Sequence, residues 1–292
     1  MKYYLFIPIL GFLLFGCKTT TEQSDAYGNF EAETVIVSAE STGKILQLNV
    51  EKGQQIKSGM VAAVIDTVQI QLKMLQIDAQ KAAVTSRRQS ISSQIEVLKE
   101  QRKNLGINET RIQSMLKDGA STQKQLDDIQ GQISVINKQI ESTKTQYISV
   151  SKELEVLDAQ KVLLIDQLNR CNVISPIEGT VLETYAEQGE LTATGKSLFK
   201  VADLSKLDLK VYVSGAQLPE IKLGRQVEVL IDKSEKENQS LTGTITWISS
   251  EAEFTPKIIQ TKEERVKLVY AVKVAVTNNG TLKIGMPGEI KW

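Results

Sequence analysis

The sequence contains no histidine and only two cysteines, and aromatic residues make up 5% of its 292 positions. The missing histidine removes the commonest metal ligand and the commonest general base at neutral pH. Lys plus Arg and Asp plus Glu balance at 35 each, so no basic excess favours nucleic acid as a partner. No proline lies between Pro8 and Pro176, so no proline ring interrupts helices there. These absences predict a non-enzymatic protein built around long helices, with no metal site and no cofactor.

A short apolar run, Tyr3–Phe15, follows Lys2. It is shorter than the roughly 20 residues that span a bilayer, and it is typical of a secretory signal peptide. The run ends in Leu14-Phe15-Gly16-Cys17, which resembles a bacterial lipobox. This resemblance implies a lipoprotein signal peptide over residues 1–16, acylation of Cys17, and a polar tether over residues 17–29. The alternative is a plain secretory signal with an incidental cysteine.

Two stretches, Thr42–Asp66 and Glu178–Asp203, repeat the same glycine spacing. The glycines of the first are Gly43, Gly53 and Gly59, and those of the second are Gly179, Gly189 and Gly195. The pattern resembles the half-motif of biotinyl and lipoyl carrier domains and predicts that residues 39–66 and 171–203 pair into one β-sandwich. A carrier holds its cofactor on a lysine at a hairpin tip. Neither copy has that lysine, because Lys200 falls within a predicted strand, so a carrier enzyme is disfavoured.

The residues between the two copies must leave the sandwich and return to it, which predicts a helical hairpin over residues 67–170. Aliphatic residues recur every seven positions in both arms, as in an antiparallel coiled coil. In the first arm they are Ile70, Ile77, Val84, Ile91, Leu98, Leu105 and Ile112. The seam of the second arm is Leu126, Ile129, Ile133, Ile136, Ile140, Tyr147, Val150, Leu154, Leu157, Leu164 and Leu168, with Thr143 and Lys161 as polar members.

The stretch GASTQKQLDDIQGQI, Gly119–Ile133, interrupts this pattern and predicts the hairpin tip near residues 117–122. Gly119 and Ala120 form the predicted turn. Thr122 with Gln125 matches a capping box, which starts the second helix by satisfying its first free N–H groups. A second weak point is Gly106, where we expect the first arm to break and Asn108 to restart a short final helix.

Alternating apolar residues over 204–292 predict a β-barrel and C-terminal β region, to which residues 30–38 contribute a strand. The predicted fold class is therefore α+β, multi-domain and elongated: a split lipoyl-like sandwich, a long coiled-coil hairpin and a C-terminal β-barrel.

This arrangement resembles the HlyD-type membrane fusion proteins, the periplasmic adaptors of Gram-negative efflux and secretion pumps. The stretches Cys171–Val181, Ala252–Val274 and Leu282–Ile290 support the resemblance, and Ala252–Val274 is similar to the branch paired with ATP-binding-cassette exporters. The resemblance implies a lipid-anchored protein at the periplasmic face of the inner membrane. It also implies an ABC-type permease and a TolC-like outer-membrane channel as partners, and self-association into a ring, usually of six copies.

In that family the hairpin tip often carries Arg, then Leu four residues on, then Ser eleven residues on, and these residues contact the outer-membrane channel. The matching positions are Arg111, Met115 and Thr122, so two of the three are conservatively replaced. Each also has an ordinary interpretation: a solvated helix residue, a core residue of the hairpin end, and an N-cap.

A different functional class fits the same elements. A structural or adhesive surface lipoprotein would use the coiled coil for display and would have no transporter partner.

Overall fold

The structure is a computed structural model that describes residues 24–234, 237–254 and 268–292. These residues form two compact units, one made of residues 34–202 and the other of residues up to 33 together with 203–292. The predicted signal peptide and Cys17 lie outside the described residues. Within the described ranges, no helix is both long and apolar enough to cross a bilayer.

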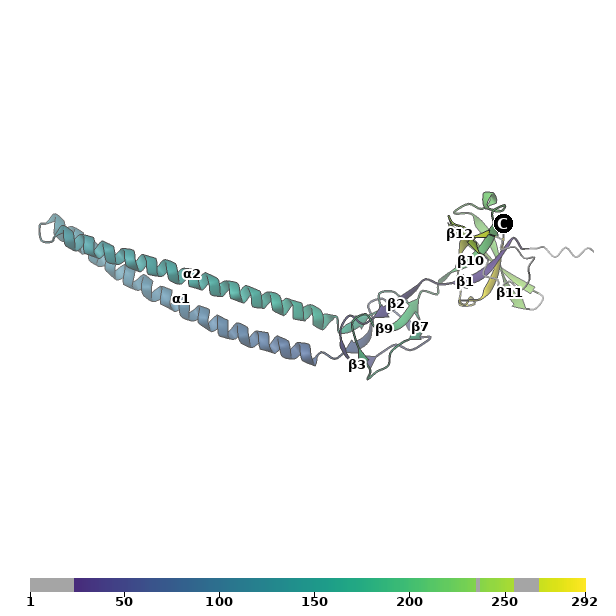
Figure 1. The fold of residues 1–292 in the computed structure, drawn as a ribbon, viewed down its shortest axis with the longest axis horizontal. Coiled ribbons are helices and arrows are strands. Elements are labelled where there is room, and N and C mark those ends of the chain that lie inside the picture. Colours follow the sequence, from purple (N-terminus) through teal and green to yellow (C-terminus); the bar gives the residue numbers. More distant parts are fainter. Residues whose placement is uncertain (1–23, 235–236, 255–267) are drawn as a thin grey trace, which may run out of the picture. The chain divides into compact units, whose positions relative to one another are not determined.

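The unit formed by the two ends of the chain is a β-barrel (Figure 1). Its described strands are β1 (Ala26–Glu31), β10 (Lys206–Ser214), β11 (Gln226–Ser234), β12 (Glu237–Ile248), β13 (Glu253–Phe254), β14 (Leu268–Thr277) and β15 (Pro287–Lys291). The order is β10-β1-β15-β11-β12-β14-β13, and pairing of β10 with β14 closes the sheet. A 3-10 turn, η1 (Leu218–Glu220), follows β10. Alternate residues of β10, such as Leu209 and Val211, point into the core and are fully buried.

The first strand of the barrel is not the one that the sequence predicted. Residues Ala26–Glu31 pair with β10 and β15, so part of the expected tether, residues 17–29, is strand. The predicted barrel strand over residues 30–38 is wrong as one element, because Thr34–Ser38 (β2) pairs with β9 in the other unit. Phe30 is buried in the barrel core and Val37 in the sandwich core. Strands β1 and β2 are short, and each buries only one large apolar side chain. The residues between them are mostly polar. The hydrophobic periodicity of the sequence therefore does not show where the barrel unit ends and the sandwich unit begins.

The second unit contains a β-sandwich of two four-stranded sheets. One sheet has the order β2-β9-β7-β4, with β9 at Ser197–Ala202, β7 at Gly179–Thr184 and β4 at Gln55–Ile56. The other has the order β6-β5-β3-β8, with β6 at Asn172–Ile174, β5 at Val61–Ile65, β3 at Gly43–Leu48 and β8 at Leu191–Thr192. Each sheet mixes strands from both sequence copies, so neither copy closes the core alone.

The two copies bond to each other reciprocally. The Gly53 N–H donates to the Val181 carbonyl at 2.8 Å, and the Gly189 N–H donates to the Ile45 carbonyl at 2.8 Å. Both glycines have a positive φ, +88° and +94°, which is the conformation that a glycine adopts without steric cost. The repeated glycine spacing therefore places equivalent turns at equivalent points of a pseudo-symmetric sandwich.

Between β5 and β6 the chain forms a hairpin of two long helices, α1 (Val68–Lys117) and α2 (Gln123–Asn169), which run side by side (Figure 1). All thirteen predicted seam positions of α2 are buried or half-buried, including Thr143 and Lys161. Charged pairs cross between the helices beside this seam: Lys81 with Asp158, Arg87 with Glu153, and Lys161 Nζ with Asp78 Oδ1 at 2.6 Å. These elements confirm the predicted fold class.

The predicted break at Gly106 is wrong, because α1 runs through it without interruption. A glycine in a helix interior costs only about 1 kcal/mol relative to alanine. The seam residues Leu105 and Ile112 on either side are half-buried against α2, and Thr110 Oγ1 donates to the Gly106 carbonyl at 3.0 Å. Packing of the neighbouring turns thus outweighs the local preference of Gly106 and Asn108.

Candidate functional site at the hairpin tip

The turn between the helices has a specific backbone structure. Gly119 follows the α1 C-cap Asp118 with φ of +72°. The Ala120 N–H donates to the Met115 carbonyl at 2.7 Å, and the Gly119 N–H donates to the Leu116 carbonyl at 3.1 Å. These two bonds are those of a Schellman motif, which satisfies the last free carbonyls of a helix. Gly119 and Ala120 therefore form the turn as predicted.

The start of α2 is fixed by the predicted capping box. Thr122 Oγ1 accepts from the Gln125 backbone N–H at 3.4 Å, and Gln125 Oε1 accepts from the Thr122 N–H at 3.0 Å. Gln125 Oε1 also accepts from the Ser121 hydroxyl at 2.6 Å. Both helix ends at the tip are therefore capped by hydrogen bonds within the tip itself.

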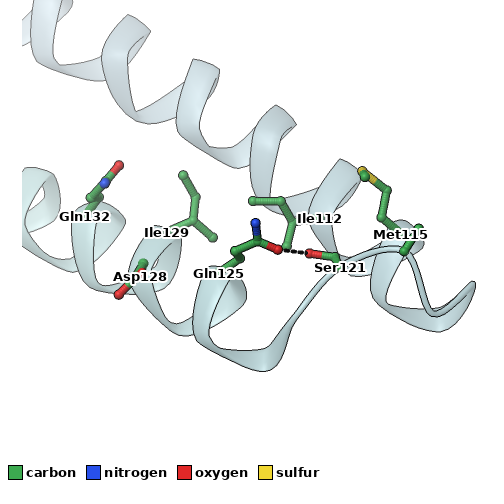
Figure 2. Close-up of a pocket in the computed structure, with 8 residues that line it drawn as sticks. Ile112, Met115, Ser121, Gln125, Asp128, Ile129 and Gln132 are labelled. Carbon is green, nitrogen blue, oxygen red and sulfur yellow. Dashed lines mark hydrogen bonds between the residues drawn. The ribbon is translucent and has the colours of Figure 1, made fainter.

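A cavity of about 290 Å³ lies where the end of α1 meets the start of α2 (Figure 2). The residues that line it are Ile112, Met115, Ala120, Ser121, Gln125, Asp128, Ile129 and Gln132. Ile112 is the last seam residue of α1, Ile129 is the second seam residue of α2, and Met115, 41% exposed, extends the apolar wall toward solvent. Gln125, Asp128 and Gln132 are exposed and form a polar edge along α2. The cavity combines an apolar floor with a polar rim, which suits a side chain inserted from another molecule.

The three residues that match the family pattern have different structural roles. Met115 lines the cavity. Thr122 acts as the α2 N-cap, and Arg111 is an exposed residue of α1 outside the cavity lining. The sequence analysis missed Gln125, Asp128 and Gln132 as lining residues. Their spacing of three and four residues places them on one face of a helix, but this spacing alone does not distinguish a cavity edge from an ordinary solvated face.

Among residues 24–234, 237–254 and 268–292, no group of three or more His, Cys, Asp or Glu side chains is arranged to hold a metal ion. Cys171 is a free, fully buried cysteine, and its Sγ lies 3.4 Å from the Ser41 hydroxyl.

Comparison with solved structures shows which proteins share this fold. MacA from Actinobacillus actinomycetemcomitans superimposes with a TM-score of 0.59 at 22% sequence identity, and the alignment covers 91% of this chain and 76% of MacA. A MacA–MexA chimeric protein carrying the Pseudomonas aeruginosa MexA α-hairpin domain gives a TM-score of 0.52 at 24% identity, covering 91% and 78%.

Sequence comparison finds relatives of similar length. A UPF0194 membrane protein of Yersinia enterocolitica is 24% identical over 323 residues, covering 98% of this chain and 95% of the relative. The UPF0194 membrane protein YbhG of Salmonella gallinarum is 24% identical over 291 residues, covering 91% and 87%. The family profile described as the barrel-sandwich hybrid domain of RND membrane fusion proteins (RND MFP) matches residues 33–204, more than half of the sequence. The chain therefore belongs to the RND-type membrane fusion protein family.

Proposed function

We propose that this protein is a periplasmic adaptor that connects an inner-membrane exporter with an outer-membrane channel for efflux or secretion. The observation that carries the proposal is the hairpin, whose helices of 50 and 47 residues end in a capped tip with a cavity. At about 1.5 Å per residue each helix is on the order of 75 Å long. A connector between two membranes needs this reach, whereas a brace for a small sandwich does not.

The transporter side of the proposal is an ABC-type exporter, and the channel side is a TolC-like protein. The tip supplies the channel contact: an apolar side chain of the channel enters the cavity beside Met115, and the rim formed by Gln125 and Asp128 bonds to its backbone or polar groups. Acyl chains on Cys17 hold the protein to the periplasmic face of the inner membrane. Mass spectrometry of the mature N-terminus tests this anchor, since each acyl chain adds a defined mass to the peptide that begins at Cys17.

Site-specific photocrosslinking in living cells tests the two contacts. One photoreactive residue replaces Lys117, the last residue of α1, and another replaces Leu223, an exposed residue of the barrel unit. A third replaces Lys99, in the middle of α1, as the control position. We expect the tip position to capture an outer-membrane channel, the barrel position to capture an inner-membrane exporter, and the control to capture neither.

If neither Lys117 nor Leu223 captures a transport component while the protein is abundant and folded, the adaptor function is wrong. Capture of surface-exposed structural proteins by Lys117 would instead support an adhesive or structural lipoprotein.

A further inference from the structure

The two helices of the hairpin carry the same four-residue motif. On α1 it is Asp78-Ala79-Gln80-Lys81, and on α2 it is Asp158-Ala159-Gln160-Lys161. A seam residue, Ile77 or Leu157, comes directly before each copy. We call these two stretches the DAQK motifs.

The DAQK motifs lie level with each other and pair reciprocally. Lys161 Nζ lies 2.6 Å from Asp78 Oδ1, and Lys81 bonds to Asp158. Because the helices run in opposite directions, the two pairs are related by a local two-fold axis between them. The side chains of Lys81 and Lys161 are only 30% and 31% exposed, so both ammonium groups are partly shielded from solvent beside the seam.

Charged pairs between the helices are confined to this part of the hairpin among the described residues. Besides the DAQK motifs, Arg87 pairs with Glu153. Nearer the tip the ion pairs join residues of the same helix: Glu96 with Lys99, Glu100 with Lys103, and Lys138 with Glu141. The helices are therefore linked by charge near the sandwich, but not over the stretch that approaches the tip.

The apolar packing of the seam changes at the same level. Every buried seam residue lies on the tip side of Lys161: Ile129, Ile140, Thr143, Val150, Leu154 and Leu157. Between the DAQK motifs and the sandwich the seam residues are only half-buried, namely Ile70, Ile77, Leu164 and Leu168. We call residues 68–77 and 162–169 the base segments. Less apolar surface is removed from water there, so the hydrophobic effect stabilises their pairing less.

The outer ends of the base segments are held by local contacts. Asp66 Oδ1 accepts from the Val68 N–H at 2.9 Å, and Arg170 pairs with Asp166 and Glu40. However, α1 has no acidic residue in its first turn and α2 has no basic residue in its last, so neither helix end has side-chain charges that complement the helix dipole. The base segments thus lie between these end contacts and the DAQK motifs.

We propose that the DAQK motifs form a charge-dependent clasp that holds the base segments together. When the clasp is broken, the base segments open locally while the coiled coil between the motifs and the tip stays paired. Local opening of this kind is expected where few apolar contacts are buried. The inference concerns a conformational device within the hairpin, and it does not rest on the proposed adaptor function.

The position of Lys161 makes the clasp sensitive to loss of either charge. A single exposed ion pair contributes little to stability. Here two pairs act at the same level, and Lys161 occupies a seam position that faces α1. Removing the charge of Asp78 leaves this half-buried ammonium group without its partner, which costs more than the loss of an exposed pair.

Hydrogen–deuterium exchange of the purified full-length protein, read by mass spectrometry, tests the clasp. Asp78→Lys and Lys161→Asp each place like charges opposite each other, and the double variant restores opposite charges. We expect each single variant to accelerate exchange in both base segments by about threefold or more, and the double variant to return most of the way to the wild-type rate. Residues 98–117 and 123–143 should exchange at the wild-type rate in all three.

The matched control is Glu96→Lys, which makes the same kind of charge reversal on α1 but disturbs a pair within one helix. We expect it to leave the base segments unchanged. Unchanged exchange in the single variants, or a double variant as open as the singles, would overturn the proposal. Equal acceleration in the base segments and near the tip would also overturn it, because the hairpin would then open as one unit.

Salt provides a second test on the same protein. Raising NaCl from 0.1 M to 1 M shortens the screening length from about 10 Å to about 3 Å, so we expect faster exchange of the wild-type base segments. The variant Asp78→Ala with Lys161→Leu replaces one pair by an apolar seam residue and should respond less to salt. Equal responses of the two proteins, or no response of the wild type, would show that charge does not hold the base segments closed.

Discussion

At the residue scale, two glycines of the hairpin differ in backbone conformation, one left-handed and one right-handed helical. Gly119 has φ of +72° at the α1 C-terminus, and Gly106 has an ordinary helical conformation within α1. A Cβ built at either position meets no other atom within 4 Å. Differences between their alanine variants therefore report backbone conformation alone.

We expect Gly119→Ala to destabilise the hairpin by about 1 kcal/mol, because a side chain disfavours the left-handed region. Gly106→Ala is expected to stabilise it by about 0.5–1 kcal/mol, because alanine loses less entropy in a helix. Urea denaturation followed by far-UV circular dichroism measures both. Effects of the same sign would contradict the assignment of Gly119 as the turn residue.

The cavity at the tip makes a separate prediction about binding. Met115→Glu places a charge on the apolar wall of the cavity. We expect it to reduce the yield of crosslinks between a photoreactive residue at position 117 and the channel by about tenfold or more. Val97→Glu, an exposed aliphatic position elsewhere on α1, serves as the control. Unchanged capture by Met115→Glu would show that the channel does not use the cavity.

The sequence revealed some residues of the tip and concealed others. The capping box was readable because Thr122 and Gln125 are three residues apart and bond locally. The cavity was not, because Asp128 and Gln132 acquire their role only when Met115 of the other helix lies opposite them. Local hydrogen bonding is encoded in a short window, whereas a cavity between two helices depends on their relative register.

At the scale of elements, the seam of α2 was predictable in full, because a seven-residue repeat maps directly onto one side of a helix. Its polar member Thr143 is 6% exposed, and its hydroxyl donates to the Gln139 carbonyl at 2.8 Å. The Gln139 carbonyl already accepts a backbone hydrogen bond within α2, so the hydroxyl's bond adds little to stability. The hydroxyl also occupies a seam position where a methyl group would make apolar contact. Thr145 makes the same kind of bond, to the Glu141 carbonyl at 3.1 Å, on the exposed side.

We therefore expect Thr143→Val to raise the free energy of unfolding of the hairpin by about 0.5–1 kcal/mol. Thr145→Val should change it by less than about 0.5 kcal/mol, since its surroundings are solvent. Thermal and urea denaturation of the two variants provide the comparison. A loss of stability in Thr143→Val would mean that the buried hydroxyl has a partner across the seam.

At the scale of the whole molecule, the described residues divide into two units that do not share a core. The boundary between the two units was only partly predictable from the sequence. The change of unit between Glu31 and Thr34 occurs within three residues, without the proline, glycine or serine that usually marks a boundary. The pairing of β1 with β15 joins residues at opposite ends of the chain, and no local pattern encodes it.

Gly28 offers a way to disturb one unit alone. A Cβ at this position of β1 would lie 1.8 Å from the Lys210 carbonyl oxygen, which is backbone and cannot turn aside. We expect Gly28→Ala to destabilise the barrel by about 3 kcal/mol or more and to leave the hairpin and sandwich unchanged. Calorimetry should show the barrel transition at lower temperature and the other transition in place. A joint shift of both transitions would contradict the independence of the two cores.

The nested order of the elements along the chain also determines when each part of the fold can be completed. The hairpin is inserted within the sandwich, between β5 and β6, and the whole 34–202 unit is inserted within the barrel, between β1 and β10. A chain emerging from a ribosome or a translocation pore therefore completes its innermost layer first and its outermost layer last. Strand β1 emerges early and must wait for β15, the last strand among the described residues, before its second edge is paired. We therefore expect the described elements to fold from the centre of the sequence outward, and the barrel to be complete only once Pro287–Lys291 has paired with β1 and β11.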